Sequence, residues 1–376
     1  MRIGFFGHDA HDAAIAKRVR GFQRDGHEVQ GFMMRRGPDG PHEWDNIDLG
    51  LSHDGRLWHR YKMVRRAVRQ LKKSPEALKA CDLIYARNPD MLLCAVSTVQ
   101  ALNMEKPIVY ECLDVHKLLA RDNFRAFCGR QLERRLIKKT ALTVISSPAF
   151  YDNYFARHHK GMQHILLENR LINPEVLPAP IETPPSPLLR IGWFGMLRCA
   201  RSLSLLKQIA EQFPAQVEIV IHGKISKHAV GDLEGKIKSL ANINYHGPYK
   251  APDDLAKIYG SVDVVWAGDF SQAGLNSKWL LPNRIYEGGF YATPPIAPRA
   301  CQTGQWVEER AIGFTLPESL EASFPVLVQQ LLENRAVIEE KSQRLARLDR
   351  DVFIEPKGAL DEILSQAVAN HQQRRR

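Results

Sequence analysis

The sequence predicts an α/β protein built from two doubly wound domains, and three observations support this fold class. Short apolar runs alternate with longer helical patterns, as in the strand–helix–strand units of a parallel sheet. The run 190–195 (Arg-Ile-Gly-Trp-Phe-Gly) echoes the run 2–7 (Arg-Ile-Gly-Phe-Phe-Gly), so the same pattern starts twice. A chain of 376 residues also exceeds what one hydrophobic core usually supports. We therefore expect two Rossmann-like domains of similar topology that face each other across a cleft.

The first domain is expected to span residues 1–172. Its apolar runs predict strands at 2–7, 27–34, 82–87, 107–113, 142–146 and 164–167, with helices at 12–24, 88–103 and 124–139. The stretch 37–55 is rich in Gly, Pro and Asp, so we expect a long loop there, followed by a basic helix.

A proline-rich stretch at 173–188 predicts a semi-rigid linker between the domains. The second domain is expected at 189–356, where the strand and helix patterns resume. Strands are predicted at 190–195, 217–222, 243–245, 262–267 and 313–316, and helices at 202–213, 230–241 and 252–259. A last helical pattern lies within 357–376.

The formal charge of +10 is concentrated in the first half of the chain. Residues 1–180 hold 29 Lys and Arg against 20 Asp and Glu, while the remainder holds 23 against 22. The basic residues alternate with apolar ones, which is typical of an amphipathic helix that rests on anionic lipid head groups. A solvated helix face explains the pattern equally well, and nucleic-acid binding is disfavoured because no recognition motif accompanies the charge. The basic residues in question are Arg56, Arg60, Lys62, Arg65, Arg66, Arg69, Lys72, Lys73, Arg130, Arg134, Arg135, Lys138 and Lys139.

The sequence contains no apolar run of membrane-spanning length, and no signal peptide is recognisable. We therefore expect a cytoplasmic protein that associates peripherally with the inner membrane. The six cysteines are scattered without the spacing of a zinc site, so we expect them to be reduced and do not expect a structural metal.

The stretch 281–298 reads as a loop, a short helix and a buried strand. Pro282 suits the first turn of the helix, and the prolines at 294 and 295 end it. Glu287 is a carboxylate that can accept two hydrogen bonds side by side from the vicinal hydroxyls of a ribose, and Arg284 lies one turn nearer the helix N-terminus, where it can face a phosphate. The pattern predicts a nucleoside diphosphate site, although a solvated helix carboxylate is the alternative for Glu287.

This run resembles the donor-sugar-nucleotide motif of family 4-like glycosyltransferases with the GT-B fold of two Rossmann domains. The matching residues are Pro282, Arg284, Ile285, Tyr286, Glu287, Pro294 and Ile296. More narrowly, the chain is similar to bacterial exopolysaccharide glycosyltransferases of the succinoglycan-assembly type. The resemblance implies a donor site in the second domain, an acceptor site in the first and a last helix that crosses back to the first domain.

The sequence departs from the family pattern at two places. Where fuller members have a second glutamate, eight residues before the ribose ligand, this chain has Trp279. The Gly-Arg…Lys pair that grips the diphosphate is replaced by Gly195 with Met196, and the cations Arg198 and Arg201 follow at shifted positions. The residues expected at the donor nucleotide are Arg198, Arg201, Lys224, Lys278, Asn283, Arg284 and Glu287.

In the first domain, residues that follow predicted strands are candidates for acceptor binding and catalysis. Gly7, His8 and Asp9 end the first strand, but the missing third glycine and the basic end of the next strand argue against a dinucleotide fingerprint. Asp114 is a candidate general base that deprotonates an acceptor hydroxyl or orients His116, and capping of the next helix is the equal alternative. Arg87, at another strand end, is a weaker candidate for acceptor or phosphate contact.

The resulting hypothesis is a glycosyltransferase that moves a hexose, glucose by resemblance, from a UDP-linked donor to a lipid-linked or growing saccharide. Fixed cations can stabilise the charge on a departing diphosphate without a metal, so we expect neither a metal nor another cofactor. Two alternatives remain open: a sugar-nucleotide epimerase of the same fold, and a non-catalytic regulator that binds sugar nucleotide or polysaccharide. The sugar, the acceptor, the linkage and the stereochemical outcome do not follow from the sequence.

Overall fold

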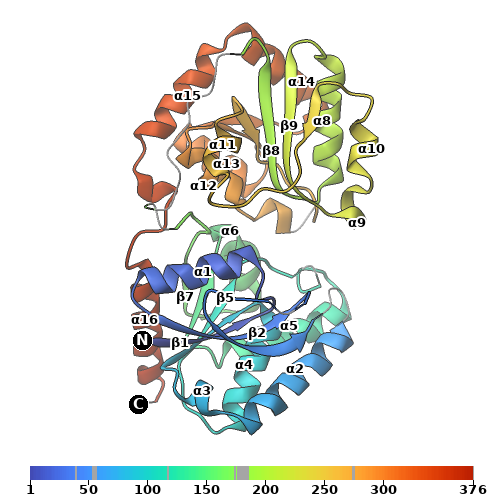
Figure 1. Ribbon diagram of the computed structural model, residues 1–376. Helices are drawn as coiled ribbons and strands as arrows, with labels where there is room; N and C mark the ends of the chain where they lie inside the picture. The colour runs from blue at the N-terminus through green and yellow to red at the C-terminus, as the bar shows by residue number, and fades with distance from the viewer. Residues whose placement is uncertain are drawn as a thin grey trace. The chain divides into compact units, whose positions relative to one another are not determined.

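The computed structural model describes residues 1–38, 40–52, 57–116, 118–172, 175, 186–272 and 276–375, without the side chains of 57 and 58. The chain divides into two compact units (Figure 1). One unit combines Met1–Glu168 with Pro356–Arg376, and the other is Asn169–Glu355. Most of the predicted linker, 173–174 and 176–185, lies outside the described residues.

The first unit contains a seven-stranded parallel sheet in the order β3-β2-β1-β4-β5-β6-β7. Its strands are β1 (Arg2–Gly7), β2 (Glu28–Arg35), β3 (Asp45–Leu51), β4 (Leu83–Arg87), β5 (Ile108–Cys112), β6 (Leu142–Ile145) and β7 (His164–Leu166). Its helices are α1 (Ala13–Arg24), α2 (Leu57–Lys73), α3 (Glu76–Lys79), α4 (Pro89–Ala101), α5 (Phe124–Ile137), α6 (Pro148–Phe150), a π-helical turn η1 (Tyr151–Phe155), α7 (Ala156–His158) and α16 (Ala359–Gln373).

Local sequence signals set several of these helix ends. The side chain of Asp12 accepts hydrogen bonds from the N–H groups of Ala14 and Ile15 and so caps α1. Asn123 caps α5 in the same way, and α4 begins at a proline, which needs no N–H partner. The final helix α16 buries Leu360, Ile363, Leu364 and Ala367 in one core with residues of α1 and of the strands. Figure 1 shows α1 and α16 on one face of this sheet and α2 and α4 on the other.

The prediction of a continuous loop at 37–55 is wrong in part, because the strand β3 occupies Asp45–Leu51. β3 is an edge strand that pairs only with β2 among the described residues. Of its side chains only Leu49 is fully buried, so the segment lacks the apolar pattern by which an interior strand is recognised.

The second unit contains a six-stranded parallel sheet in the order β10-β9-β8-β11-β12-β13. Its strands are β8 (Leu189–Leu197), β9 (Val217–Ile225), β10 (Ile243–Tyr245), β11 (Val264–Trp266), β12 (Pro295–Pro298) and β13 (Phe314–Leu316). Its α-helices are α8 (Ala200–Gln212), α9 (Lys227–Val230), α10 (Leu233–Ile237), α11 (Leu255–Tyr259), α12 (Asn283–Phe290), α13 (Gln302–Arg310), α14 (Leu320–Glu333) and α15 (Ala336–Arg347). The helix predicted at 230–241 is therefore wrong in extent: Gly231, with φ of 70°, separates α9 from α10.

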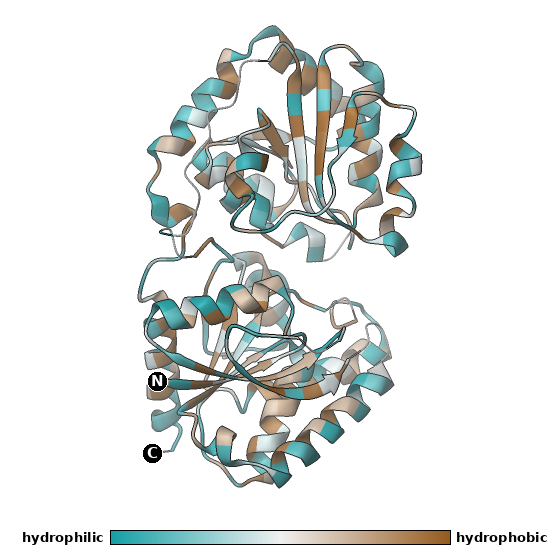
Figure 2. Cartoon of the chain, in the orientation of Figure 1, coloured by the Kyte–Doolittle hydropathy of each residue, from teal (hydrophilic) through white to brown (hydrophobic). Residues whose placement is uncertain are grey.

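Alternation along the strands of the second sheet builds a separate core on each face. Ile191, Trp193 and Trp266 belong to the core with α8, α10 and α14, while Phe194 and Val265 belong to the core with α11, α12 and α13. Figure 2 shows apolar residues concentrated on the strands, whereas the helices mix apolar and polar residues.

The strand order reverses direction at β8 in the second sheet and at β1 in the first. In open α/β sheets, ligands bind outside the carboxyl ends of the strands at such a switch point. The loops after β8 and β11, and those after β1 and β4, are therefore where a site is expected in each unit.

Candidate functional site

Strands β8 and β9 come very close together near their carboxyl ends, where Gly195 pairs with Gly223 at the switch point of the second sheet. Gly195 and Gly223 have φ values of 106° and 145°, a region that favours glycine. A Cβ atom on Gly223 would lie 1.7 Å from the carbonyl oxygen of Gly195. The close approach of these two backbones therefore requires glycine at position 223.

The stretch around Glu287 has the predicted local structure, with α12 at Asn283–Phe290, Pro282 as its N-cap and β12 at Pro295–Pro298. Glu287 is only 7% exposed, and one of its oxygens accepts a hydrogen bond of 2.8 Å from the hydroxyl of Tyr259. Burial, and then the charge of Glu287, raise the pKa of Tyr259 well above its ordinary value and that of Tyr291 to about 12. Both tyrosines stay protonated at neutral pH, and Tyr259 thus remains a donor that orients the carboxylate.

Three of the predicted cations lie around an acid that the sequence analysis did not identify, Asp269. Arg198 places Nη2 at 3.3 Å from Asp269 Oδ2, and Arg284 donates a hydrogen bond of 3.1 Å to the carbonyl of Trp266. Burial raises the pKa of Asp269, but the charge of Arg198, two hydrogen bonds from Ser271 and the charge of Arg284 outweigh it, so this pKa is lowered. Asp269 is therefore an ionised carboxylate at the centre of the cationic group. The third cation, Lys278, follows Ser277, whose hydroxyl lies 3.4 Å from Asp269 Oδ1.

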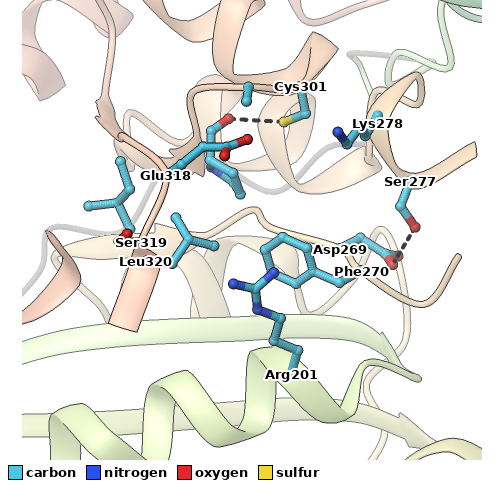
Figure 3. Close-up of a pocket in the computed structure, with 12 residues that line it drawn as sticks. Arg201, Asp269, Phe270, Ser277, Lys278, Cys301, Glu318, Ser319 and Leu320 are labelled. Atoms are coloured by element: carbon cyan, nitrogen blue, oxygen red, sulfur yellow. Dashed lines mark hydrogen bonds between the residues drawn. The ribbon is translucent and has the colours of Figure 1, made fainter. Parts of the chain in front are cut away.

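A cavity of about 220 Å³ opens beside this group (Figure 3). Arg201 and Lys278 line it together with Asp269, and Figure 3 shows these three side chains around the same space. The guanidinium of Arg201 lies 4.8 Å from the ring centre of Phe270 and also pairs with the exposed Glu321 at 3.0 Å. The cavity is thus lined by cations, one buried carboxylate and an aromatic ring.

The remaining predicted donor residues lie further out. Lys224 is exposed on β9, next to Gly223. Asn283 is exposed at the first position of α12, and its side-chain oxygen accepts a hydrogen bond of 2.7 Å from Asn169. The structure therefore brings Arg198, Arg201, Lys278 and Arg284 into one neighbourhood and places these two residues at its periphery.

Sequence reasoning missed Asp269 because no motif marks it. A usable signal existed, since Asp269 lies three residues after the end of β11 and β11 is the strand beside the switch point. The loop that it begins leads to Lys278 and then to α12, with 273–275 outside the described residues.

In the first unit, the predicted residues after β1 lie at the carboxyl edge of the sheet. Gly7 is buried, and a Cβ atom there would lie 2.9 Å from Cδ1 of Ile15. Nδ1 of His8 lies 3.0 Å from the side-chain nitrogen of Asn88, a residue with φ of 75° that precedes α4. Asp9 accepts a hydrogen bond of 3.2 Å from the N–H of His11, which shapes the turn into α1.

Arg87, predicted as a weaker candidate for acceptor contact, lies in a buried ion pair. Its side chain is 2% exposed and lies 2.6 Å from Glu111, which Arg18 contacts from the other side at 3.0 Å. Burial raises the pKa of Glu111, but the charges of Arg87 and Arg18 outweigh it, so this pKa is lowered. The guanidinium of Arg87 is held by this buried ion pair, and its contact with an acceptor stays a prediction.

Asp114 and His116 follow β5 at the same edge. Asp114 is exposed, and the cap of the next long helix, α5, is Asn123, so the alternative that Asp114 caps this helix is wrong. Nδ1 of His116 accepts a hydrogen bond of 3.3 Å from the N–H of Leu118, which leaves Nε2 as the protonated nitrogen of the neutral ring.

Two properties of the described part of the chain bear on metal binding and on membrane insertion. No group of three or more His, Cys, Asp or Glu side chains there could hold a metal ion. No helix there is sufficiently long and apolar to cross a lipid bilayer.

Comparison with known proteins places the chain in a family. No family model matches it. The succinoglycan biosynthesis protein ExoL of Rhizobium meliloti (strain 1021) is 34% identical over 358 residues, which cover 92% of this chain and 88% of that protein.

Solved structures agree on the fold. HepE of Anabaena, in complex with UDP and glucose, has a TM-score of 0.71 at 17% identity and covers 97% of this chain and 99% of its own. Sucrose-phosphate synthase from Thermosynechococcus elongatus has a TM-score of 0.72 at 14% identity and covers 100% and 98%. The predicted GT-B architecture is confirmed. This chain therefore belongs to the family of the succinoglycan biosynthesis protein ExoL and has the GT-B fold of glycosyltransferases.

Proposed function

We propose that the protein is a glycosyltransferase that transfers glucose from UDP-glucose to a lipid-linked or growing saccharide in exopolysaccharide biosynthesis. Membership of the ExoL family and the GT-B fold support the class of enzyme. HepE, which shares the fold, has been crystallised with UDP and with UDP-glucose, and this supports the choice of donor.

The observation that carries the proposal is the group of cations in the second unit beside the buried Glu287. A glycosyl transfer from such a donor leaves a nucleoside diphosphate, on whose phosphate oxygens negative charge develops in the transition state. Fixed guanidinium groups such as Arg198 and Arg284 stabilise this charge without reorganisation. Glu287, oriented by Tyr259, accepts hydrogen bonds from the vicinal hydroxyls of the ribose.

For the acceptor we propose the carboxyl edge of the first sheet. Asp114 is exposed there, as a general base that must reach an acceptor hydroxyl has to be. His8 and His116 flank this edge after β1 and β5 and supply hydrogen bonds to the acceptor. Replacement of Asp114 by Asn should abolish transfer while nucleotide binding persists, and unchanged transfer would remove Asp114 from this role.

We further propose that the first unit lies on an anionic membrane surface. The solvent side of α2 carries Lys62, Arg65, Arg66, Arg69, Lys72 and Lys73. Helix α5 adds exposed apolar side chains, with Phe124 79%, Phe127 51% and Leu132 45% exposed. Large apolar side chains among basic ones are typical of a helix that lies in the lipid interface. A solvated protein surface gains nothing from exposing two phenylalanines on one helix.

Isothermal calorimetry against UDP, GDP and ADP tests the donor site. We expect UDP to bind and Glu287→Gln to weaken it about tenfold or more, because the uncharged amide is a poorer acceptor for two hydroxyls. Glu211→Gln, an exposed substitution at the end of α8, is the matched control and should bind like the wild type. Thermal melting of each variant excludes unfolding as the cause.

The outcomes separate the candidate functions. If none of the three diphosphates binds, the proposal is wrong as stated. If UDP binds, incubation with labelled UDP-glucose and membrane extract distinguishes the three candidate functions. A glycosyltransferase yields labelled saccharide, an epimerase yields an isomeric sugar, and a non-catalytic regulator yields neither.

A further inference from the structure

The small cavity of the second unit has the composition of a sugar pocket. Its walls combine the buried carboxylate Asp269, the ring of Phe270 and the hydroxyl of Ser277, with Glu318 and Ser319 at the start of α14. Carboxylates accept hydrogen bonds from sugar hydroxyls, and an aromatic ring offers an apolar face to the C–H side of a pyranose.

The carboxylate of Asp269 is held in one orientation. The side chain is 6% exposed. Oδ1 accepts hydrogen bonds from the N–H and the hydroxyl of Ser271 at 2.8 and 2.6 Å, and Arg198 lies 3.3 Å from Oδ2. The hydroxyl of Ser277 makes the longest contact, at 3.4 Å, and its rotation can give this acceptor to an incoming hydroxyl. A ligand thus meets a fixed acceptor, and little conformational entropy is lost on binding.

The size of the cavity indicates which part of a ligand it takes. Its volume of about 220 Å³ is below the roughly 300 to 1,000 Å³ of pockets that enclose drug-sized ligands. The cavity therefore has room for part of a nucleotide sugar, such as one sugar ring, rather than for the whole molecule.

The residues that line the cavity also indicate that the sugar ring would be linked to a diphosphate. Arg201 and Lys278 are exposed cations that line the cavity, and they are two of the residues proposed to hold the diphosphate. A sugar linked to a diphosphate held by these two cations would lie at the cavity.

The start of α14 supports a functional role for this wall. Ser319 lies at the N-cap of α14 with φ of 67° and ψ of 56°, a left-handed conformation that is unfavourable for a residue with a side chain. This conformation directs the chain after β13 so that Glu318, Ser319 and Leu320 all line the cavity.

We propose that this cavity holds the transferred sugar and that Asp269 and Glu318 determine which hexose is accepted, by accepting hydrogen bonds from its hydroxyls. This inference rests on the proposed function, because it assigns the sugar end of the same donor. Asp269 contacts the substrate here and at the same time positions Arg198.

The ratio of the Kd for UDP-glucose to the Kd for UDP isolates the contribution of the sugar. Calorimetry with both ligands on Asp269→Asn and Glu318→Gln should show this ratio raised about tenfold in each variant, since a hydrogen bond to a charged acceptor is lost or weakened. Any effect through Arg198 on the diphosphate changes both Kd values and cancels in the ratio. Glu309→Gln, on α13 and outside the cavity lining, is the matched control and should leave the ratio unchanged.

The possible results are distinct. An unchanged ratio in both variants overturns the inference, even if the Kd for UDP itself changes in Asp269→Asn, because Asp269 would then act only on Arg198. Failure of the wild type to bind UDP, GDP or ADP would overturn the proposed function and this inference with it. Should Asp269→Asn fail to fold, Ser277→Ala and Glu318→Gln test the same wall, and an unchanged ratio in both of these overturns the inference.

Discussion

The buried ion pair of the first unit offers a sharp test of how this fold is stabilised. Arg18 and Arg87 share the carboxylate of Glu111, and all three side chains are at most 2% exposed. Removal of the negative charge by Glu111→Gln leaves two guanidinium groups buried without a counter-charge in this trio. Removal of one partner of a buried ion pair costs about 3 to 5 kcal/mol. For a unit of this size we expect the melting temperature to fall by on the order of 10 °C.

Urea unfolding followed by circular dichroism measures this loss, with the two units treated as separate transitions. The matched control is Glu43→Gln, which breaks the exposed pair between Glu43 and Arg20 in the same unit. Exposed pairs contribute about 0 to 1 kcal/mol, so the two variants should differ severalfold in their effect. A loss of less than about 1 kcal/mol for Glu111→Gln would refute the reasoning, because the buried charges would then be compensated in another way.

The pH dependence gives a second check of the same pair. The pKa of Glu111 is lower in the folded state than in the unfolded chain, so the stabilisation by its charge is fully present above the unfolded pKa of about 4.3. It is lost as the pH falls below that value toward the folded pKa. The difference in stability between wild type and Glu111→Gln should therefore stay constant above about pH 5 and shrink at lower pH.

Two further predictions concern the membrane surface and the close backbone approach. The double variant Phe124→Ser, Phe127→Ser should bind phosphatidylglycerol vesicles at least tenfold more weakly in co-sedimentation, because apolar area is lost from the interface, while Val326→Ser, an equally exposed apolar site in the second unit, should bind normally. Equal binding by all three proteins would contradict the proposed surface. Gly223→Ala should destabilise the second unit by at least about 3 kcal/mol in urea unfolding, because its Cβ atom meets the Gly195 carbonyl, whereas Gly195→Ala should cost only about 1 to 2 kcal/mol of backbone strain. Equal losses would show that the backbones can separate.

The strands and long helices were predictable because their signals are local. Alternation of apolar runs and helical patterns located β1, β4, β5, β10 and α1 within a residue or two of their observed bounds. The edge strand β3 was missed because an edge strand buries too few side chains to show a pattern. The break between α9 and α10 was missed because a single glycine within a helical pattern is tolerated as often as it ends a helix.

In the candidate site, too, features with a local sequence signal were predicted and features that depend on distant residues were not. The motif around Glu287 predicted the helix α12 and the strand β12, since the spacing of Pro282, Arg284 and Glu287 is a property of one short segment. The burial of Glu287 followed only from the structure. The ion pair of Arg87 was not predicted, because a strand-end arginine looks the same in sequence whether it faces solvent or pairs with Glu111 on the neighbouring strand. Asp269 was missed for a related reason, as its partners come from the loop after β8, from α12 and from its own loop.

By itself, the sequence determined the two α/β domains, the short helix that carries Arg284 and Glu287, and the basic character of the first domain. These properties depend on periodicity, on composition and on residues within one segment. Only the tertiary structure decided which cations gather around Asp269, that Arg87 is held in a buried ion pair, and that α16 packs in the first unit. These outcomes depend on contacts between segments far apart in the chain, whose geometry is set by how the strands of each sheet are ordered and how tightly the side chains between them pack.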